Sequence, residues 1–167
     1  NGPQFEKILS YIEGAKAEGA NCVIGGNSVD GPECGQGWFI EPTVFTDVTS
    51  EMTIAREEVF GPVLAVMTFD DEDEAVCLAN DTIYGLAAGI WTRDLARAHR
   101  LARRIQSGTV YVNTYRAVSV VSPVGGYKMS GFGRENGIEA IREFMQTKSV
   151  WVNMADRMAN PLATEPG

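Results

Sequence analysis

The 167-residue sequence contains few of the side chains from which metal centres and hydrolytic active sites are built. It has three cysteines, Cys22, Cys34 and Cys77, and a single histidine, His99. Because the cysteines are odd in number and show no Cys-x-x-Cys spacing, we expect neither a disulfide framework nor a metal site. One histidine within a helical run, without a Gly-x-Ser-x-Gly sequence, also argues against a Ser-His-Asp hydrolase. This cysteine content fits a reducing, cytoplasmic location.

Long hydrophobic runs are missing as well. The longest apolar stretches, residues 62–67 and 118–121, are far shorter than the roughly 18 residues that a membrane span requires, so we expect no membrane association. Residue 1 is Asn, and no basic segment followed by an apolar one opens the sequence. We therefore expect no secretory signal, and a chain that is part of a longer protein.

Basic residues are scarce in the first half of the sequence. Residues 1–92 hold three basic and 16 acidic side chains, whereas residues 93–167 hold 11 basic and six acidic ones. Five arginines lie between Arg93 and Arg104 on a helical pattern without interleaved aromatic residues, which is typical of a solvated helix face. A nucleic-acid partner is therefore not expected.

The hydrophobic periodicity predicts an α/β fold. Apolar residues at helical spacing predict helices over residues 4–18, 75–80, 95–105 and 138–145. Short apolar or β-branched runs predict strands at residues 21–24, 38–48, 62–69, 87–91, 109–113 and 149–153. This alternation indicates βαβ units and a mostly parallel sheet with flanking helices. The last strand has no partner after it, so we expect it to pair with another chain or with another part of the same protein.

A glycine-rich segment at residues 131–137 resembles a dinucleotide-binding fingerprint. Its third glycine comes one position too late, however, and no strand is predicted directly before it. We interpret these glycines as turn and close-approach positions, and Glu135 as an acid at a helix start. Cys34 also lies in a glycine-rich loop, but no partner base is visible, and a cysteine without a catalytic role is the better interpretation.

Residues 57–63, Glu-Glu-Val-Phe-Gly-Pro-Val, place two acids and an aromatic residue directly before a buried strand. Such acids can be simply solvated. A carboxylate beside an aromatic ring can also accept hydrogen bonds from two ribose hydroxyls while the ring packs on a planar base. The spacing alone leaves both interpretations open.

Several segments together carry a family resemblance. They are residues 39–44, 57–63, 84–89, 108–113 and 123–133, the last reading Pro-Val-Gly-Gly-Tyr-Lys-Met-Ser-Gly-Phe-Gly. In order and spacing the sequence is similar to the aldehyde dehydrogenase superfamily from about residue 5 to residue 153. The resemblance implies the C-terminal portion of such an enzyme. Residues 1–145 would then belong to the catalytic α/β domain, residues 146–154 to an oligomerisation strand, and residues 155–167 to a tail.

The resemblance implies oxidation of an aldehyde to a carboxylic acid through a cysteine thioester. In this family a thiolate attacks the carbonyl, hydride passes to the nicotinamide of NAD or NADP, and a water activated by a glutamate hydrolyses the thioester. The family's nucleophile stands in a Gly-Gln-x-Cys segment, which this sequence does not contain, and none of the three cysteines matches that context. The base glutamate would also lie upstream. We therefore expect this chain alone to be inactive.

Other site residues of the family have matches here. The resemblance assigns Glu58 to the nicotinamide ribose, Phe60 to the vicinity of the nicotinamide, and Leu86 to a further cofactor contact. Glu135 matches a glutamate proposed to relay protons from the active site.

Two further positions concern the substrate. Val118 and Val124 fall where many members of the family place aromatic residues that line the aldehyde tunnel. Aliphatic walls weaken the case for betaine aldehyde, because a quaternary ammonium binds to ring faces through cation–π contacts. Arg116 could instead attract an acidic aldehyde, although a surface arginine is an equally good interpretation.

The resemblance also implies a homo-oligomer, either a dimer or a tetramer. Two alternatives stay open: a non-catalytic interaction module with the same fold, and a semialdehyde dehydrogenase that forms acyl-CoA. An upstream Gly-Gln-x-Cys segment would exclude the interaction module. Because the rest of such an enzyme would cover apolar sheet and helix faces, we expect the chain alone to associate or to be poorly soluble.

Overall fold

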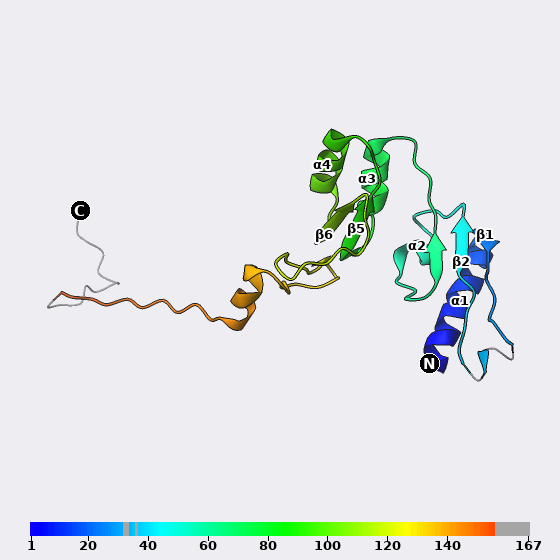
Figure 1. The fold of residues 1–167 in the computed structure, drawn as a ribbon, viewed down its shortest axis with the longest axis horizontal. Helices are drawn as coiled ribbons and strands as arrows, with labels where there is room; N and C mark the ends of the chain where they lie inside the picture. The colour runs from blue at the N-terminus through cyan, green and yellow to red at the C-terminus, as the bar shows by residue number, and fades with distance from the viewer. Residues whose placement is uncertain (32–33, 36, 156–167) are drawn as a thin grey trace, which may run out of the picture.

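The computed structural model describes residues 1–31, 34–35 and 37–155 (Figure 1). In chain order its elements are α1 (Gly2–Glu18), β1 (Asn21–Ile24), β2 (Thr43–Thr46), α2 (Thr53–Arg56), β3 (Val63–Ala65), α3 (Glu72–Asn80), β4 (Tyr84–Gly85), β5 (Ala87–Ile90), α4 (Leu95–Arg104), β6 (Thr109–Val112), β7 (Tyr127–Lys128) and the 3₁₀ helix η2 (Ile138–Phe144). Within these ranges no helix has both the length and the apolar character that crossing a bilayer requires.

The first helix begins and ends where local sequence signals place its boundaries. The Asn1 side chain accepts a hydrogen bond from the Gln4 backbone N–H at 3.0 Å, which caps the helix N-terminus. Gly19 ends the helix in a left-handed conformation, with its N–H directed to the carbonyls of the last turn. On the inner face, Ile8 and Ile12 are buried in one core with Phe45 of β2. The predicted helix over residues 4–18 is therefore confirmed, with an earlier start.

The strands form three small sheets instead of one. β2 lies between β1, which is antiparallel to it, and β3, which is parallel to it. β5 and β6 form a parallel pair, and β4 and β7 an antiparallel pair. The α/β class is confirmed, but the expected single, mostly parallel sheet is not formed by the described residues. A strand extends only as far as its backbone partners, so β3 covers just three residues of the predicted strand at residues 62–69.

The C-terminal elements also differ from the predictions. The helix expected over residues 138–145 is the 3₁₀ helix η2, which has no buried side chain. Residues 149–153 form no strand, and Figure 1 shows this part of the chain running as an extended trace away from the other elements. A strand requires a hydrogen-bonded partner, and none of the described strands lies against these residues.

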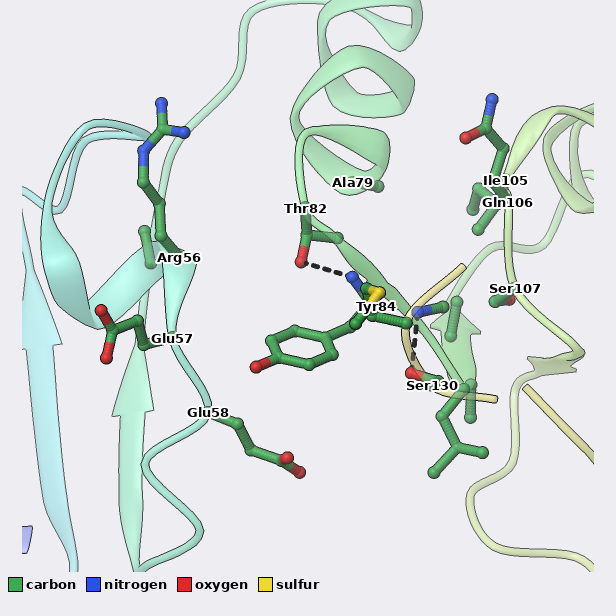
Figure 2. A pocket seen from close by; sticks show the side chains of 16 residues that line it. Arg56, Glu57, Glu58, Ala79, Thr82, Tyr84, Ile105, Gln106, Ser107 and Ser130 are labelled. Atoms are coloured by element: carbon green, nitrogen blue, oxygen red, sulfur yellow. Dashed lines mark hydrogen bonds between the residues drawn. The ribbon is translucent and has the colours of Figure 1, made fainter. Parts of the chain in front are cut away.

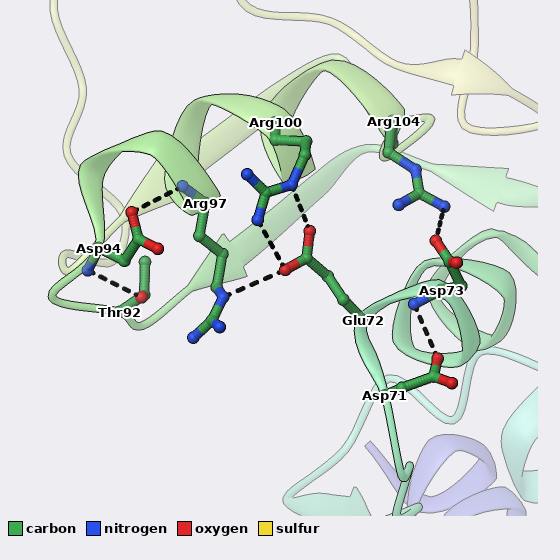
Figure 3. A network of polar contacts seen from close by, with 8 residues as sticks. All are labelled: Asp71, Glu72, Asp73, Thr92, Asp94, Arg97, Arg100 and Arg104. Atoms are coloured by element: carbon green, nitrogen blue, oxygen red, sulfur yellow. Dashed lines mark hydrogen bonds and ion pairs between the residues drawn. The ribbon is translucent and has the colours of Figure 1, made fainter.

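Charged side chains join α3 to α4 (Figure 3). Glu72 accepts hydrogen bonds from Arg97 Nε at 3.1 Å and from Arg100 Nε at 2.6 Å, and Arg104 pairs with Asp73 at 2.7 Å. The arginine face of α4 was predicted to be solvated, and Arg97, Arg100 and Arg104 are indeed exposed, but the sequence did not predict that they pair with α3. The hydrogen bond from Arg100 is the largest cause that lowers the pKa of Glu72 to about 2.

This low pKa predicts a loss of stability in acid. A carboxyl group whose pKa is lower in the folded than in the unfolded chain stabilises the fold above its ordinary pKa of 4.5, and that contribution is lost as the pH falls towards about 2. We expect Glu72→Gln to remove this part of the pH dependence, as measured by urea unfolding at a series of pH values. Glu51→Gln breaks only an exposed ion pair with Arg56 and should keep the wild-type profile. Identical profiles for wild type and Glu72→Gln would contradict the prediction.

Candidate functional site

Two neighbouring cavities lie among the segments that carry the family resemblance, and Leu86 and Ser130 line both of them. The first, of about 500 Å³, lies between α2 with its following loop and the chain from the end of α3 to β5 (Figure 2). The second, of about 560 Å³, is lined mainly by the loop around residues 124–136 and by η2. Both volumes fall within the range of small-molecule sites, about 300–1,000 Å³.

The two acids at the start of the 57–63 segment have different environments, although both line the first cavity. The Glu57 carboxylate accepts a hydrogen bond from the Tyr11 hydroxyl at 2.6 Å, and this bond raises the pKa of Tyr11 above its usual value. Glu58 is exposed, and its carboxylate accepts no hydrogen bond from any described residue. In Figure 2 its side chain extends towards the side of the cavity where Tyr84 and Ser130 lie. Of the two acids, Glu58 is the one free to bind a ligand.

Phe60 follows in the same loop but lines neither cavity. Its side chain is 79% exposed, and its backbone φ is 54°, a left-handed value that is uncommon for a bulky residue. The Gln4 side-chain amide donates to the carbonyls of Val59 and Phe60, at 3.2 and 3.1 Å. The loop is therefore held by α1 in an unusual conformation.

The opposite wall of the first cavity is fixed by short polar contacts. The Tyr84 N–H donates to Thr82 Oγ1 at 3.2 Å, and the Gly85 N–H donates to Ser130 Oγ at 3.0 Å (Figure 2). These bonds hold β4 against the glycine-rich loop of residues 124–136. The half-exposed side chain of Leu86 thereby borders both cavities. Sequence reasoning did not single out Tyr84 and Ser130 as separate residues, although both stand within segments of the resemblance.

The second cavity brings together Leu86, Val124 and Glu135. Val124 and Glu135 are paired through both backbone N–H···O=C bonds, at 2.8 and 2.7 Å. The sequence analysis placed Glu135 at a helix start. This is wrong, because η2 starts only at Ile138. Val118 is 72% exposed and lines neither of the two cavities, so the structure separates it from Val124.

The glycines of this region allow backbone segments to approach each other closely. A Cβ atom on Gly108 would lie 1.6 Å from the Gly125 carbonyl oxygen, and one on Gly125 would lie 2.5 Å from the Gly133 carbonyl oxygen. The segment at residues 131–137 is preceded by the two-residue strand β7 and followed by a 3₁₀ helix. The strand was not predicted, but the absence of an α-helix start at this point supports the interpretation of turn and close-approach glycines.

The described residues of this site include no cluster suited to metal binding and no cysteine. Among residues 1–31, 34–35 and 37–155, no three His, Cys, Asp or Glu side chains lie close enough together to hold a metal ion. Cys22, Cys34 and Cys77 carry free thiols, and none of them lines either cavity. What the arrangement can do is bind hydroxyl groups, since the Glu58 carboxylate offers several acceptor positions on a cavity large enough for a ribose.

Comparison with known proteins identifies relatives over nearly the whole chain. Betaine aldehyde dehydrogenase from Brucella anthropi is 54% identical over 154 residues, which are 92% of this chain and 32% of that protein. The protein of the same name from Cereibacter sphaeroides is 53% identical over 151 residues, which are 90% of this chain and 30% of that protein. The chain thus spans about a third of the length of these relatives.

Solved structures show the same similarity in three dimensions. The NAD⁺ complex of an aldehyde dehydrogenase from Bacillus cereus has a TM-score of 0.85 and 45% identity over 93% of this chain and 31% of that one. A point mutant of betaine aldehyde dehydrogenase from Staphylococcus aureus, in complex with NAD⁺, has a TM-score of 0.90 and 41% identity over 98% of this chain and 33% of that one. The family model described as "Aldehyde dehydrogenase family" matches residues 1–150, and the chain therefore belongs to the aldehyde dehydrogenase family.

Proposed function

We propose that this chain is the C-terminal portion of an NAD(P)-dependent aldehyde dehydrogenase, in which it supplies part of the cofactor site and of the substrate site. Residues 1–145 would complete the catalytic domain and residues 146–154 the oligomerisation strand, with residues 155–167 as a tail. The observation that carries this proposal is the carboxylate of Glu58, which accepts no hydrogen bond from the described residues, on a cavity that it shares with Leu86. The NAD⁺ complexes among the structural relatives support the choice of cofactor.

Three residues would hold the nicotinamide half of NAD or NADP. The Glu58 carboxylate would accept hydrogen bonds from the two ribose hydroxyls, as carboxylates do at charge-assisted sites. Leu86 would supply an apolar surface across the cavity, and the exposed ring of Phe60 would pack near the nicotinamide. The bound nicotinamide would supply the hydride acceptor for the oxidation.

Two residues of the second cavity would act on the substrate side. Val124 would line the aldehyde tunnel, together with Val118 once the rest of the protein is in place. The Glu135 carboxylate, which is exposed beside Val124, would relay protons away from the reaction. The thiolate nucleophile and the general base would come from outside this chain, so the chain alone is expected to have no activity.

Betaine aldehyde is the first candidate substrate, because the relatives at 50–54% identity are betaine aldehyde dehydrogenases. The aliphatic residues Val118 and Val124 argue against a quaternary ammonium, but they are not the only residues near this site. The second cavity is also lined by Phe132 and Phe144 and by the carboxylate of Glu143. Ring faces beside carboxylates attract an organic cation. An unbranched aliphatic aldehyde is the second candidate.

The test uses the full-length protein that contains this chain, with NAD⁺ and NADP⁺, betaine aldehyde and a short aliphatic aldehyde, with and without coenzyme A. We expect reduction of at least one cofactor, and none with the isolated chain. The ratio of kcat/KM for the two aldehydes decides the substrate class, and a requirement for coenzyme A would indicate the acyl-CoA-forming alternative. A full-length protein that reduces neither cofactor would contradict the proposal and favour an interaction module.

A homo-oligomer, dimer or tetramer, is the assembly that we propose for this protein, with residues 149–153 pairing to a second copy. Val150, Trp151 and Val152 are all exposed, with Trp151 at 92%, and an extended segment with free backbone groups favours strand pairing. We expect the isolated chain to associate in size-exclusion chromatography with light scattering. Shortening the chain to residues 1–148 should reduce this association. A monodisperse monomer of residues 1–167 would contradict the prediction.

A further inference from the structure

The loop that carries Glu58 is tied to the first helix of the chain. We propose that Tyr11 is a positioning residue for Glu58, because its hydroxyl on α1 holds the neighbouring Glu57 and so fixes the 57–60 loop at the edge of the first cavity. The inference rests on the proposed function, in which Glu58 binds the cofactor ribose.

Contacts from α1 flank Glu58 on both sides. Before it, the Tyr11 hydroxyl donates to Glu57 Oε2 at 2.6 Å, a short bond to a charged acceptor. After it, the Gln4 amide donates to the Val59 carbonyl at 3.2 Å and to the Phe60 carbonyl at 3.1 Å. Each of these bonds joins residues at least 46 positions apart in the sequence. The placement of the loop is therefore a property of the tertiary structure.

Glu58 depends on the contacts of its neighbours, because its own side chain makes no hydrogen bond to the described residues. Residues 57–60 belong to neither a helix nor a strand, and the Glu58 side chain is exposed without a hydrogen bond from any described residue. The left-handed φ of Phe60 is also a conformation that an L residue adopts only when its surroundings impose it. The place of the Glu58 backbone at the edge of the cavity is thus set by its chain neighbours, and the Tyr11 hydroxyl makes the side-chain contact on its N-terminal side.

α1 is a suitable anchor because its inner face is packed. Ile8 and Ile12 are buried in the core, and Val59 is buried in the same core. A Cβ atom on Gly61 would lie 2.6 Å from Ile8 Cδ1, so the chain directly after the loop lies close against the helix. The hydrogen bond to Glu57 raises the pKa of Tyr11, so the contact favours the protonated phenol, which is the form that donates. A fixed helix and a protonated donor together restrict the loop.

The test uses the full-length protein and compares Tyr11→Phe with Ser10→Ala. Ser10 donates only to the Lys7 carbonyl within α1, so its loss removes a hydrogen bond of the helix without touching the loop. The free energy of one hydrogen bond corresponds to a change of about threefold to tenfold in a binding constant. We therefore expect Tyr11→Phe to raise the KM for NAD⁺ by about that factor. The KM for the aldehyde and kcat at saturating NAD⁺ should stay close to the wild-type values. Ser10→Ala should change none of the three.

Hydrogen–deuterium exchange supplies a readout that does not depend on activity. Tyr11→Phe should speed up exchange at residues 57–61 while the buried face of α1 keeps its protection. Glu57→Ala should have the same effect, the double variant should be no faster than either single one, and Glu57→Gln should stay slow because its amide oxygen still accepts from the phenol. Unchanged exchange in Tyr11→Phe, or additive effects in the double variant, would overturn the proposal.

The two readouts separate this inference from the function on which it rests. Faster exchange with a raised KM for NAD⁺ supports both. Faster exchange with an unchanged KM would show that α1 holds the loop without affecting cofactor binding, which overturns the positioning role, and the KM of Glu58→Ala then decides whether the proposed cofactor site stands. Slow exchange with a raised KM would mean that Tyr11 acts on the cofactor directly, which overturns the positioning role alone.

Discussion

The Gly108→Ala variant of this chain should melt about 6–12 °C below the wild type, which corresponds to a loss of about 3 kcal/mol in a chain of this size. The added Cβ would lie 1.6 Å from the Gly125 carbonyl oxygen, far inside any real contact distance. The position of the Cβ atom is fixed by the backbone and the oxygen is itself a backbone atom, so no side-chain rotation can relieve the overlap. Gly108, directly before β6, and Gly125, in the glycine-rich loop of residues 124–136, would have to separate.

That separation would spread to the candidate site. The Gly108 N–H donates to the Gly85 carbonyl at 3.0 Å, and Gly85 is itself bonded to Ser130 through its own N–H. A Cβ atom on Gly85 would lie 2.5 Å from the Gln106 carbonyl oxygen, so this junction has no spare room. Moving Gly108 would therefore loosen the wall that the two cavities share at Ser130.

Gly14→Ala is the matched control. Gly14 lies inside α1, where a Cβ atom would meet nothing within 4 Å. Because alanine is favoured over glycine in a helix by about 0.5–1 kcal/mol, this variant should melt about 1–4 °C above the wild type. Thermal unfolding followed by far-UV circular dichroism measures both changes. A Gly108→Ala chain as stable as the wild type would show that the backbone segments around Gly85, Gly108 and Gly125 are not packed against one another as described.

Glu58→Ala in the full-length protein should raise the KM for NAD⁺ by about 10- to 100-fold, the largest effect on function that we predict. Hydrogen bonds to a charged group contribute about 1.5–3 kcal/mol, and each 1.4 kcal/mol is a factor of ten. Glu58→Gln keeps one acceptor oxygen but loses the charge, and it should fall between wild type and Glu58→Ala. The KM for the aldehyde should change little, because the substrate side of the proposed site belongs to the second cavity.

The control for Glu58→Ala is Glu6→Ala. Glu6 is an exposed acid on α1 that lines neither cavity, so its loss changes the net charge by the same amount without touching the site. Steady-state kinetics with the cofactor varied at saturating aldehyde measures both variants. Equal KM values for NAD⁺ in wild type and Glu58→Ala would remove the main support for the cofactor site.

Local signals in the sequence placed most helices and strands correctly. Gly19 and the spacing of Ile8 and Ile12 define α1 through contacts within a few residues, which is why the helix and its C-terminal end could be predicted, although it starts two residues earlier than expected. The glycine-rich segments could likewise be interpreted as close approaches, because only glycine permits such contacts. The 3₁₀ helix η2 was harder to predict, because helical periodicity does not distinguish α from 3₁₀ geometry when no side chain is packed.

Local sequence signals could not predict which distant segments pair with each other. The arginines of α4 are exposed as predicted, but their pairing with Glu72 could not be predicted, because Glu72 stands 25–28 positions earlier and nothing in the pattern joins them. Glu57 and Glu58 looked alike, because the difference between them is a hydrogen bond from Tyr11, 46 positions away from Glu57.

The amino-acid sequence by itself determined the α/β class, the presence and the C-terminal end of its first helix, and the family motifs, since these depend on neighbouring residues and on residue types at fixed spacing. Only the tertiary structure decided that the strands of the described residues divide into three sheets, that Leu86 borders two cavities, and that Glu57, not Glu58, accepts the hydrogen bond from Tyr11. The physical reason is that sheet pairing, cavities and hydrogen-bond partners arise from backbone and side-chain groups that meet only when the chain is folded.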